Sequence, residues 1–212
     1  VEPDISKLTK PKFLRGDSPL KKLKKISQLD WNHPAKKFID NRKIPTNRHF
    51  ELFFVNKFYE WVNTIIPNKF PSLENDHPRI VIPFFDENNK MFAFQGRSFN
   101  SENPKYITII LNPEMDKVFG LNRIDKNKPL FAVEGPIDSL FLDNCIAVAG
   151  ADFNKLPLDY TIIFDNERRN KELLKQIDKT IDRGYKVVLW PDNLKEKDIN
   201  DMILSGKTKQ EI

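Results

Sequence analysis

Pairs of carboxylates follow three apolar runs of the chain, each near the carboxyl end of its run. They are Glu134 and Asp138 after residues 130–133, Asp165 and Glu167 after residues 161–164, and Asp198 and Asp201 after residues 186–190. The carboxyl ends of parallel strands lie on one edge of a sheet, so these groups can converge there. Clustered carboxylates raise one another's pKa values unless cations compensate their charge. Oxygen ligands without His or Cys favour Mg²⁺ or Mn²⁺ over zinc, which predicts a divalent-metal site for phosphoryl or nucleotidyl chemistry.

Each acid taken alone has a second interpretation. Asp and Glu residues often follow strands only because they cap the next helix. Glu167 in particular could be a first-turn acid that the helix dipole favours. The hypothesis of a metal site therefore depends on the three acidic pairs together, on three successive strand ends.

The second half of the chain must position these acids, and its pattern is that of alternating strands and helices. Four short apolar runs predict strands at 130–133, 145–149, 161–164 and 186–190, with helices at 136–143, 167–183 and 199–204. This alternation predicts a small, mainly parallel sheet flanked by helices over residues 129–212. Gly184 is well placed to end the long helix.

The preceding part of the chain has a different pattern, that of an α+β subdomain over residues 19–128. Residues 79–85 and 91–99 predict a hairpin around the turn at 86–90, and residues 105–111 a third strand of an antiparallel sheet. The many aromatic residues of 50–66 could stack on bases, but a buried core is the more usual role of such segments.

The first residues predict little regular structure. Residues 1–18 contain two prolines among scattered lysines, which is typical of an extended arm or linker. Leu20, Leu23 and Ile26 recur at helical spacing opposite four lysines, so a short basic amphipathic helix is expected over 19–29. A second helix is expected to begin at His33-Pro34. We interpret His33 as its cap or as a turn residue, because no metal-ligand partner lies at a useful spacing.

Charge divides the 212 residues into two unequal parts. Residues 1–128 contain 23 Lys and Arg against 15 Asp and Glu, whereas residues 129–212 contain 12 against 15. A basic part beside an acidic part suggests a grip for a polyanion next to a metal centre, although ordinary solvated charge is the alternative. Cys145 is the only cysteine, which excludes an internal disulfide and a four-cysteine zinc site, and it is expected to be buried. With no long apolar run and no signal-peptide pattern, we expect a soluble intracellular protein.

The order of the acidic motifs resembles the TOPRIM domain, which bacterial-type primases, topoisomerases and some nucleases share. The motifs are EG-x-x-D-S at 134–139, D-x-E at 165–167 in place of the usual D-x-D, and K-D-x-N-D at 197–201. The upstream run RIVIPFFDENNKMFAFQGRSF is similar to the segment that leads into this domain in bacterial-type DNA primases. HPAKKFIDNRKIP, FDNERRN and KDINDMI are most similar to primases of large tailed phages.

The resemblance implies a catalytic core that makes short RNA primers from NTPs on single-stranded DNA, in the cytoplasm of an infected bacterial cell. It also implies two or more Mg²⁺ or Mn²⁺ ions, a zinc-binding module before this segment and a helicase-binding module after it. The residues that match the family's motifs then receive these roles: catalysis for Glu134 and Asp165; metal binding for Glu134, Asp138, Asp165, Glu167 and Asp198, with Asp201 or Asn200 in support; template binding for Arg97, Lys105 and Lys117.

Two other functions stay open at this point. One is a TOPRIM nuclease or a topoisomerase, although a topoisomerase needs a tyrosine-bearing domain that 212 residues hardly accommodate. The other is a non-catalytic subunit of a primosome that binds single-stranded DNA. A binding role gives no reason to keep three mutually repelling acidic pairs, which favours the catalytic interpretation.

Overall fold

The computed structural model describes residues 18–150 and 152–212. The arm predicted for residues 1–18 therefore lies, except for Ser18, outside the described residues. No helix in the described part of the chain is long and apolar enough to cross a membrane.

The first part of the chain folds around an antiparallel sheet. Its described strands lie in sequence order and are β1 (Lys24–Lys25), β2 (Phe53–Val55), β3 (Arg79–Phe85), β4 (Met91–Arg97) and β5 (Tyr106–Ile110). The hairpin β3–β4 pairs Ile80 with Arg97 and turns at Asn89, which has a φ of 61°. The predicted antiparallel sheet is confirmed.

The second part folds around a parallel sheet. Its described strands are β6 (Leu130–Val133), β7 (Cys145–Ala147), β8 (Tyr160–Ile163) and β9 (Lys186–Val187), in the order β7-β6-β8-β9. All three pairings are parallel. The predicted fold class, an α/β unit with a parallel sheet preceded by an antiparallel α+β unit, is therefore confirmed.

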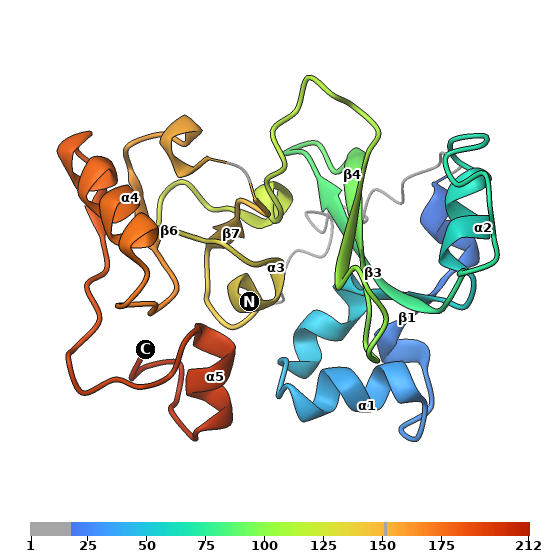
Figure 1. Ribbon diagram of the computed structural model, residues 1–212, viewed down its shortest axis with the longest axis horizontal. Helices are drawn as coiled ribbons and strands as arrows, with labels where there is room; N and C mark the ends of the chain where they lie inside the picture. The colour runs from blue at the N-terminus through green and yellow to red at the C-terminus, as the bar shows by residue number, and fades with distance from the viewer. Residues whose placement is uncertain (1–17, 151) are drawn as a thin grey trace, which may run out of the picture.

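Helices lie on the outer sides of both sheets, one short helix lies between the sheets, and two more lie along one side of the molecule (Figure 1). The α-helices are α1 (Pro34–Asn41), α2 (Phe58–Asn63), α3 (Pro136–Ser139), α4 (Lys171–Asp182) and α5 (Ile199–Leu204). Short 3-10 helices are η2 (Pro19–Lys22), η3 (Ile26–Gln28), η4 (Thr46–Glu51), η5 (Leu121–Arg123) and η6 (Phe153–Lys155). His33 caps α1, as predicted, because its ring nitrogen accepts a hydrogen bond from the backbone of Ala35 at 3.2 Å.

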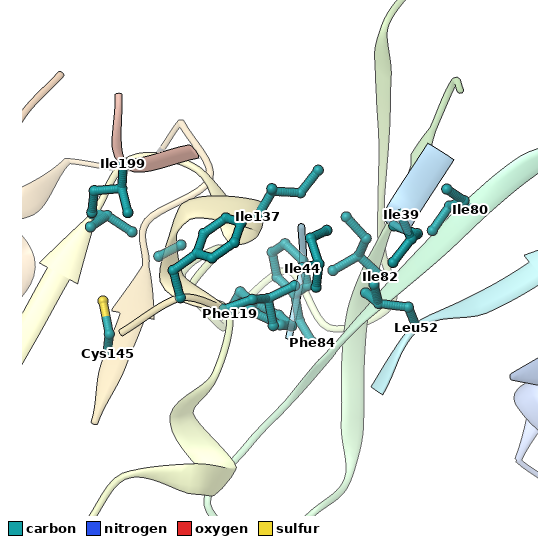
Figure 2. Close-up of a cluster of buried hydrophobic side chains, with 14 of the residues drawn as sticks. Ile39, Ile44, Leu52, Ile80, Ile82, Phe84, Phe119, Ile137, Cys145 and Ile199 are labelled. Carbon is teal, nitrogen blue, oxygen red and sulfur yellow. The ribbon is translucent and has the colours of Figure 1, made fainter. Parts of the chain in front are cut away.

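Three apolar layers result from the alternation of side chains along the strands. Val81 and Phe94 face α2 in one layer, and Ala132 and Ile162 face α4 in another. The third layer lies between the two sheets and joins residues of β3 to residues of β6, β7 and α3. Figure 2 shows part of this shared core, from Ile199 and Cys145 on one side to Leu52 and Ile80 on the other. The aromatic segment 50–66 mostly joins these layers, as predicted, since Phe53, Phe58 and Trp61 are buried, although Phe50 is exposed.

Segments at the margins depart from the predicted elements. Residues 19–29 form η2, β1 and η3 in place of a helix, because Lys24 and Lys25 pair with Phe54 and Phe53 of β2. Burial of Leu20 and Ile26 explains the apolar spacing without a continuous helix. The strand predicted at 186–190 pairs only over Lys186–Val187, where it forms an edge of the parallel sheet.

Candidate active site

Glu134 follows β6 directly, and the chain then turns into α3. Gly135 allows this turn, since a Cβ atom on it would lie 2.8 Å from an oxygen of Asp138. The Glu-Gly-Pro sequence thus places Glu134 at the strand end and lets the Asp138 carboxylate fold back against Gly135. Burial raises the pKa of Glu134, and the charge of Glu167 raises it further.

Asp165 lies after β8, and its side chain is 28% exposed. Burial, followed by the charges of Glu134, Asp138 and Asp198, raises its pKa to about 7. Acids from the end of β6, from α3 and from the start of α5 are therefore close enough to Asp165 to disfavour its ionisation. This is the electrostatic signature of a site that needs positive charge.

Asp198 and Asp138 both make hydrogen bonds at the start of α5. Asp198 is the N-cap of the helix, and its Oδ1 accepts a bond from the backbone of Asp201 at 2.8 Å. Asp138 Oδ1 accepts a bond from the backbone of Asn200 at 3.0 Å. Burial and the charge of Asp198 nevertheless raise the pKa of Asp138 to about 6. Asp138 thus fixes the start of α5, whatever it does for a metal ion.

Lys197 supplies a cation inside the acidic motif, although the sequence had suggested no role for it. Its Nζ lies 2.6 Å from Glu167 Oε1 and 3.9 Å from Asp165 Oδ2. Hydrogen bonds from Asn170 and then Lys197 hold the pKa of Glu167 below its usual range. The structure thus separates Glu167, which has a positive partner, from Glu134 and Asp165, whose ionisation is disfavoured.

The chemistry of these donors fits a hard divalent cation. Glu134, Asp165 and Asp198 offer only oxygen atoms, and the raised pKa values of the first two show that positive charge would stabilise their ionised forms. Among the described residues, no three His, Cys, Asp or Glu side chains lie as close together as one metal ion requires. Asp201 is exposed on α5 and is not among the charges that shift the pKa values of Glu134, Asp138 or Asp165.

A pocket of about 360 Å³ opens beside the acids. Its lining includes Glu134, Asp165, Glu167, Asn170 and Glu172. The acids therefore border a space large enough for part of a nucleotide, at the edge of the parallel sheet where the sequence had placed them.

Two basic residues of the antiparallel sheet, Arg97 and Lys105, lie near each other. Arg97 is buried, with its guanidinium 4.6 Å from the centre of the Tyr106 ring and 5.3 Å from that of Phe38. Burial lowers the pKa of Lys105, the charges of Arg97 and Arg42 lower it further, and Asp198 acts against them. The two predicted cations therefore lie together, and Lys105 is within electrostatic reach of Asp198.

Lys117 and Arg42 differ from what the sequence suggested. Lys117 lies in the loop before Val118, and within the described residues it forms no ion pair and is not among the charges that shift the pKa of Lys105. Arg42, to which the sequence had given no role, ends α1 and contributes to the environment of both Arg97 and Lys105. Its presence in the motif HPAKKFIDNRKIP is the feature of the sequence that could have indicated a role for Arg42.

The raised pKa values predict a pH dependence of stability when divalent ions are chelated. A carboxyl with a higher pKa in the folded chain binds more protons there, so stability falls as pH rises from its ordinary value to its folded value. For Asp165 this range runs from 3.8 to about 7. We expect the free energy of unfolding, measured by urea titration in EDTA, to fall less steeply over this range in Asp165→Asn than in the wild type. Parallel curves for the two proteins would contradict the assignment.

Comparison with known proteins yields matches in sequence and in structure. The chain is 37% identical over 195 residues to the DNA primase of Enterobacteria phage T4, an alignment that covers 89% of the chain and 56% of that primase. The chain thus spans little more than half of this relative. No protein-family model matches it.

Solved structures share its fold. The Aquifex aeolicus primase, solved with its zinc-binding and RNA polymerase domains, matches with a TM-score of 0.60 and 20% identity, over 85% of this chain and 54% of that one. A DnaG primase catalytic domain bound to single-stranded DNA matches with a TM-score of 0.60 and 13% identity, over 86% and 73% of the two chains.

Proposed function

The chain is related to the DNA primases and has the fold of their catalytic cores, and on this premise we propose that it synthesises short RNA primers on single-stranded DNA. The observation that carries the proposal is the meeting of two charged groups. Burial and the charge of Glu134, at the end of β6, raise the pKa of Asp165 after β8, and Lys105, which lies next to Arg97 of β4, is within electrostatic reach of Asp198. Nucleotidyl transfer needs such a pair, with metal ligands on one side and phosphate contacts on the other.

Each group has a distinct part in the proposed reaction. Two or more Mg²⁺ or Mn²⁺ ions, when bound, would neutralise the triphosphate and acidify the primer's 3′-hydroxyl. Asp165 and Asp198 would hold these ions, while Glu134, at the mouth of the pocket, would bind metal or accept the hydroxyl proton. Glu167, Asp138 and Asp201 would support them, through Lys197, Asn200 and the cap of α5 respectively.

Template and partners follow from the same premise. One catalytic domain of the same fold was solved with single-stranded DNA bound, which supports such a template for this chain. Arg97 and Lys105 would contact its phosphates, with Lys117 farther along the loop. We further propose that NTPs and the RNA primer occupy the pocket, that a replicative helicase binds through segments other than this one, and that the protein acts in the cytoplasm of an infected bacterium.

The test of the function is incorporation of labelled NTPs on single-stranded DNA with Mg²⁺ or Mn²⁺, resolved by product length. Short RNA products that require both template and metal are expected. Degraded template without synthesis would replace the proposal with a nuclease. DNA binding without either reaction would replace it with a non-catalytic subunit.

Lys105 gives a prediction for template binding. One lost phosphate contact should reduce the slope of log affinity against log salt by about 0.7 on single-stranded DNA. We therefore expect Lys105→Ala to bind single-stranded DNA about 3–10-fold more weakly at low salt, with a shallower salt dependence. Fluorescence anisotropy at several salt concentrations measures both. Lys90→Ala, which removes an exposed lysine from the β3–β4 turn, should match the wild type. Equal losses in the two variants would indicate only a general charge effect.

A further inference from the structure

Helix α5 carries Asp198 at its start, and its position depends on contacts from a distant part of the chain. We infer that Arg42 is a positioning residue, which clamps α5 through Asn200 and so sets the place of Asp198 beside Asp165. This inference deepens the proposed function and rests on it for its consequence in catalysis, while the clamp itself stands on the contacts below.

Arg42 and Asn200 bond to each other twice. Arg42 Nη1 donates to Asn200 Oδ1 at 2.5 Å, and Asn200 Nδ2 donates back to the Arg42 carbonyl at 2.8 Å. Asn200 is 1% exposed, so both polar ends of its side chain depend on these bonds. Because the Asn200 amide donates one hydrogen bond to Arg42 and accepts another from it, the two residues are held in a fixed relative position.

Asn200 passes this constraint to the acidic cluster. Its backbone N–H donates to Asp138 Oδ1, and it lies two residues after Asp198, in the first turn of α5. The first turn is therefore held from two sides, by Arg42 at the end of α1 and by Asp138 of α3. Asp198 is the N-cap of that turn, so its carboxylate is placed by the same contacts.

The other end of α5 has a second contact from the same loop. Lys43 Nζ donates to the carbonyls of Ile203 and Leu204 at 3.3 and 3.5 Å. A helix of six residues is not stable by itself, and its place depends on such contacts and on the burial of Ile199 and Met202. Lys43 thus offers a matched comparison, because it touches α5 without touching Asn200.

A phosphate contact is the rival role for Arg42, since its charge influences both Arg97 and Lys105. The geometry favours positioning. The guanidinium carbon lies 5.0 Å from the centre of the Phe38 ring, and one of its nitrogens is committed to Asn200. A phosphate contact would not need Asn200 to donate a hydrogen bond to the Arg42 carbonyl. A clamp needs this second bond, because it fixes the two residues relative to each other.

The test compares Arg42→Lys, Asn200→Ala and Lys43→Ala by two measurements that need no catalysis. Binding of Mn²⁺, followed by the electron paramagnetic resonance of the free ion, should weaken about tenfold in the first two variants, as is usual for residues that support metal ligands. Amide hydrogen exchange across 198–204 should quicken in the same two variants. Lys43→Ala should keep the Mn²⁺ affinity of the wild type, and thermal melting confirms that each variant folds.

The outcomes separate the clamp from the proposed function. Unchanged exchange and unchanged Mn²⁺ binding in Asn200→Ala would overturn the clamp while leaving the function in place. Faster exchange in Asn200→Ala, combined with a wild-type protein that binds no Mn²⁺, would keep the clamp and remove the metal-dependent function. A fourth variant, Arg42→Ala, tests the phosphate contact by its affinity for single-stranded DNA. Weaker DNA binding in Arg42→Ala, with Asn200→Ala like the wild type in all measurements, would assign Arg42 to phosphate instead.

Discussion

Asp165→Asn is expected to abolish primer synthesis, with a loss of about 10³-fold or more in the rate of NTP incorporation with either Mg²⁺ or Mn²⁺. The amide keeps the shape of the side chain but removes the charge that would hold a metal ion. Burial, and then the charges of Glu134, Asp138 and Asp198, raise the pKa of Asp165 to about 7, so its ionised form needs a compensating cation. Quantified product on single-stranded DNA measures the effect, at a pH above 7 so that the wild-type acid is ionised.

Unfolding cannot explain that loss, and the structure supplies the reason. Without metal ions the ionised Asp165 is a cost to the folded state, so an uncharged amide should leave the chain at least as stable. Asp192→Asn is the matched control, because Asp192 is exposed, pairs with Arg168 and is not among the charges that shift the pKa of Asp165. Activity of Asp165→Asn within tenfold of the wild type would show that Asp165 binds no essential ion.

Glu134→Gln carries the second large effect. If Glu134 binds metal or accepts a proton, synthesis should fall by about 10²–10⁴-fold. Affinity for single-stranded DNA should not change, because the proposed phosphate contacts come from β4 and β5. Burial already raises the pKa of Glu134, so the neutral amide suits its surroundings and the fold should persist. Parallel assays of NTP incorporation and of fluorescence anisotropy separate the two effects.

Glu172→Gln is the control for this substitution, since Glu172 borders the same pocket on exposed helix α4. It should synthesise primers at a rate close to that of the wild type. A drop in DNA affinity of Glu134→Gln as large as its drop in activity would remove Glu134 from the chemistry. It would then be a residue that shapes the template groove.

Continuous apolar runs made much of the fold predictable. Strands at 79–85 and 130–133 have the bounds that the sequence suggested, because nearly every residue in them is buried and the apolar run is continuous. The helix at 199–204 also has its predicted bounds. The helix predicted for residues 19–29 was wrong. Its apolar spacing suits a helix, but pairing with a strand farther along the chain determines its structure. Lys24 and Lys25 pair with residues of β2, and no local pattern announces that pairing.

Some residues of the candidate site could likewise be predicted from the sequence, and others could not. Carboxylates at strand ends can be found from the sequence, since topology alone brings the ends of parallel strands together. Arg42 and Asn200 could not be paired, because 158 residues separate them and their contact exists only after both sheets have packed. Lys197 could be found in its sequence motif. That it lies closer to Glu167 than to Asp165 could not be predicted, because sequence spacing does not give these distances.

The apolar layer between the sheets has a consequence for the division at residues 128 and 129, which stays a prediction. Phe84 and Phe119 lie on one side of that division and Ile137 and Cys145 on the other, yet they form one cluster. Cutting the chain there would expose the inner face of each part to water, so neither part should be excised or transplanted as a self-sufficient unit. The distance between the acids of one sheet and the cations of the other is thus set by the packing of the two sheets against each other.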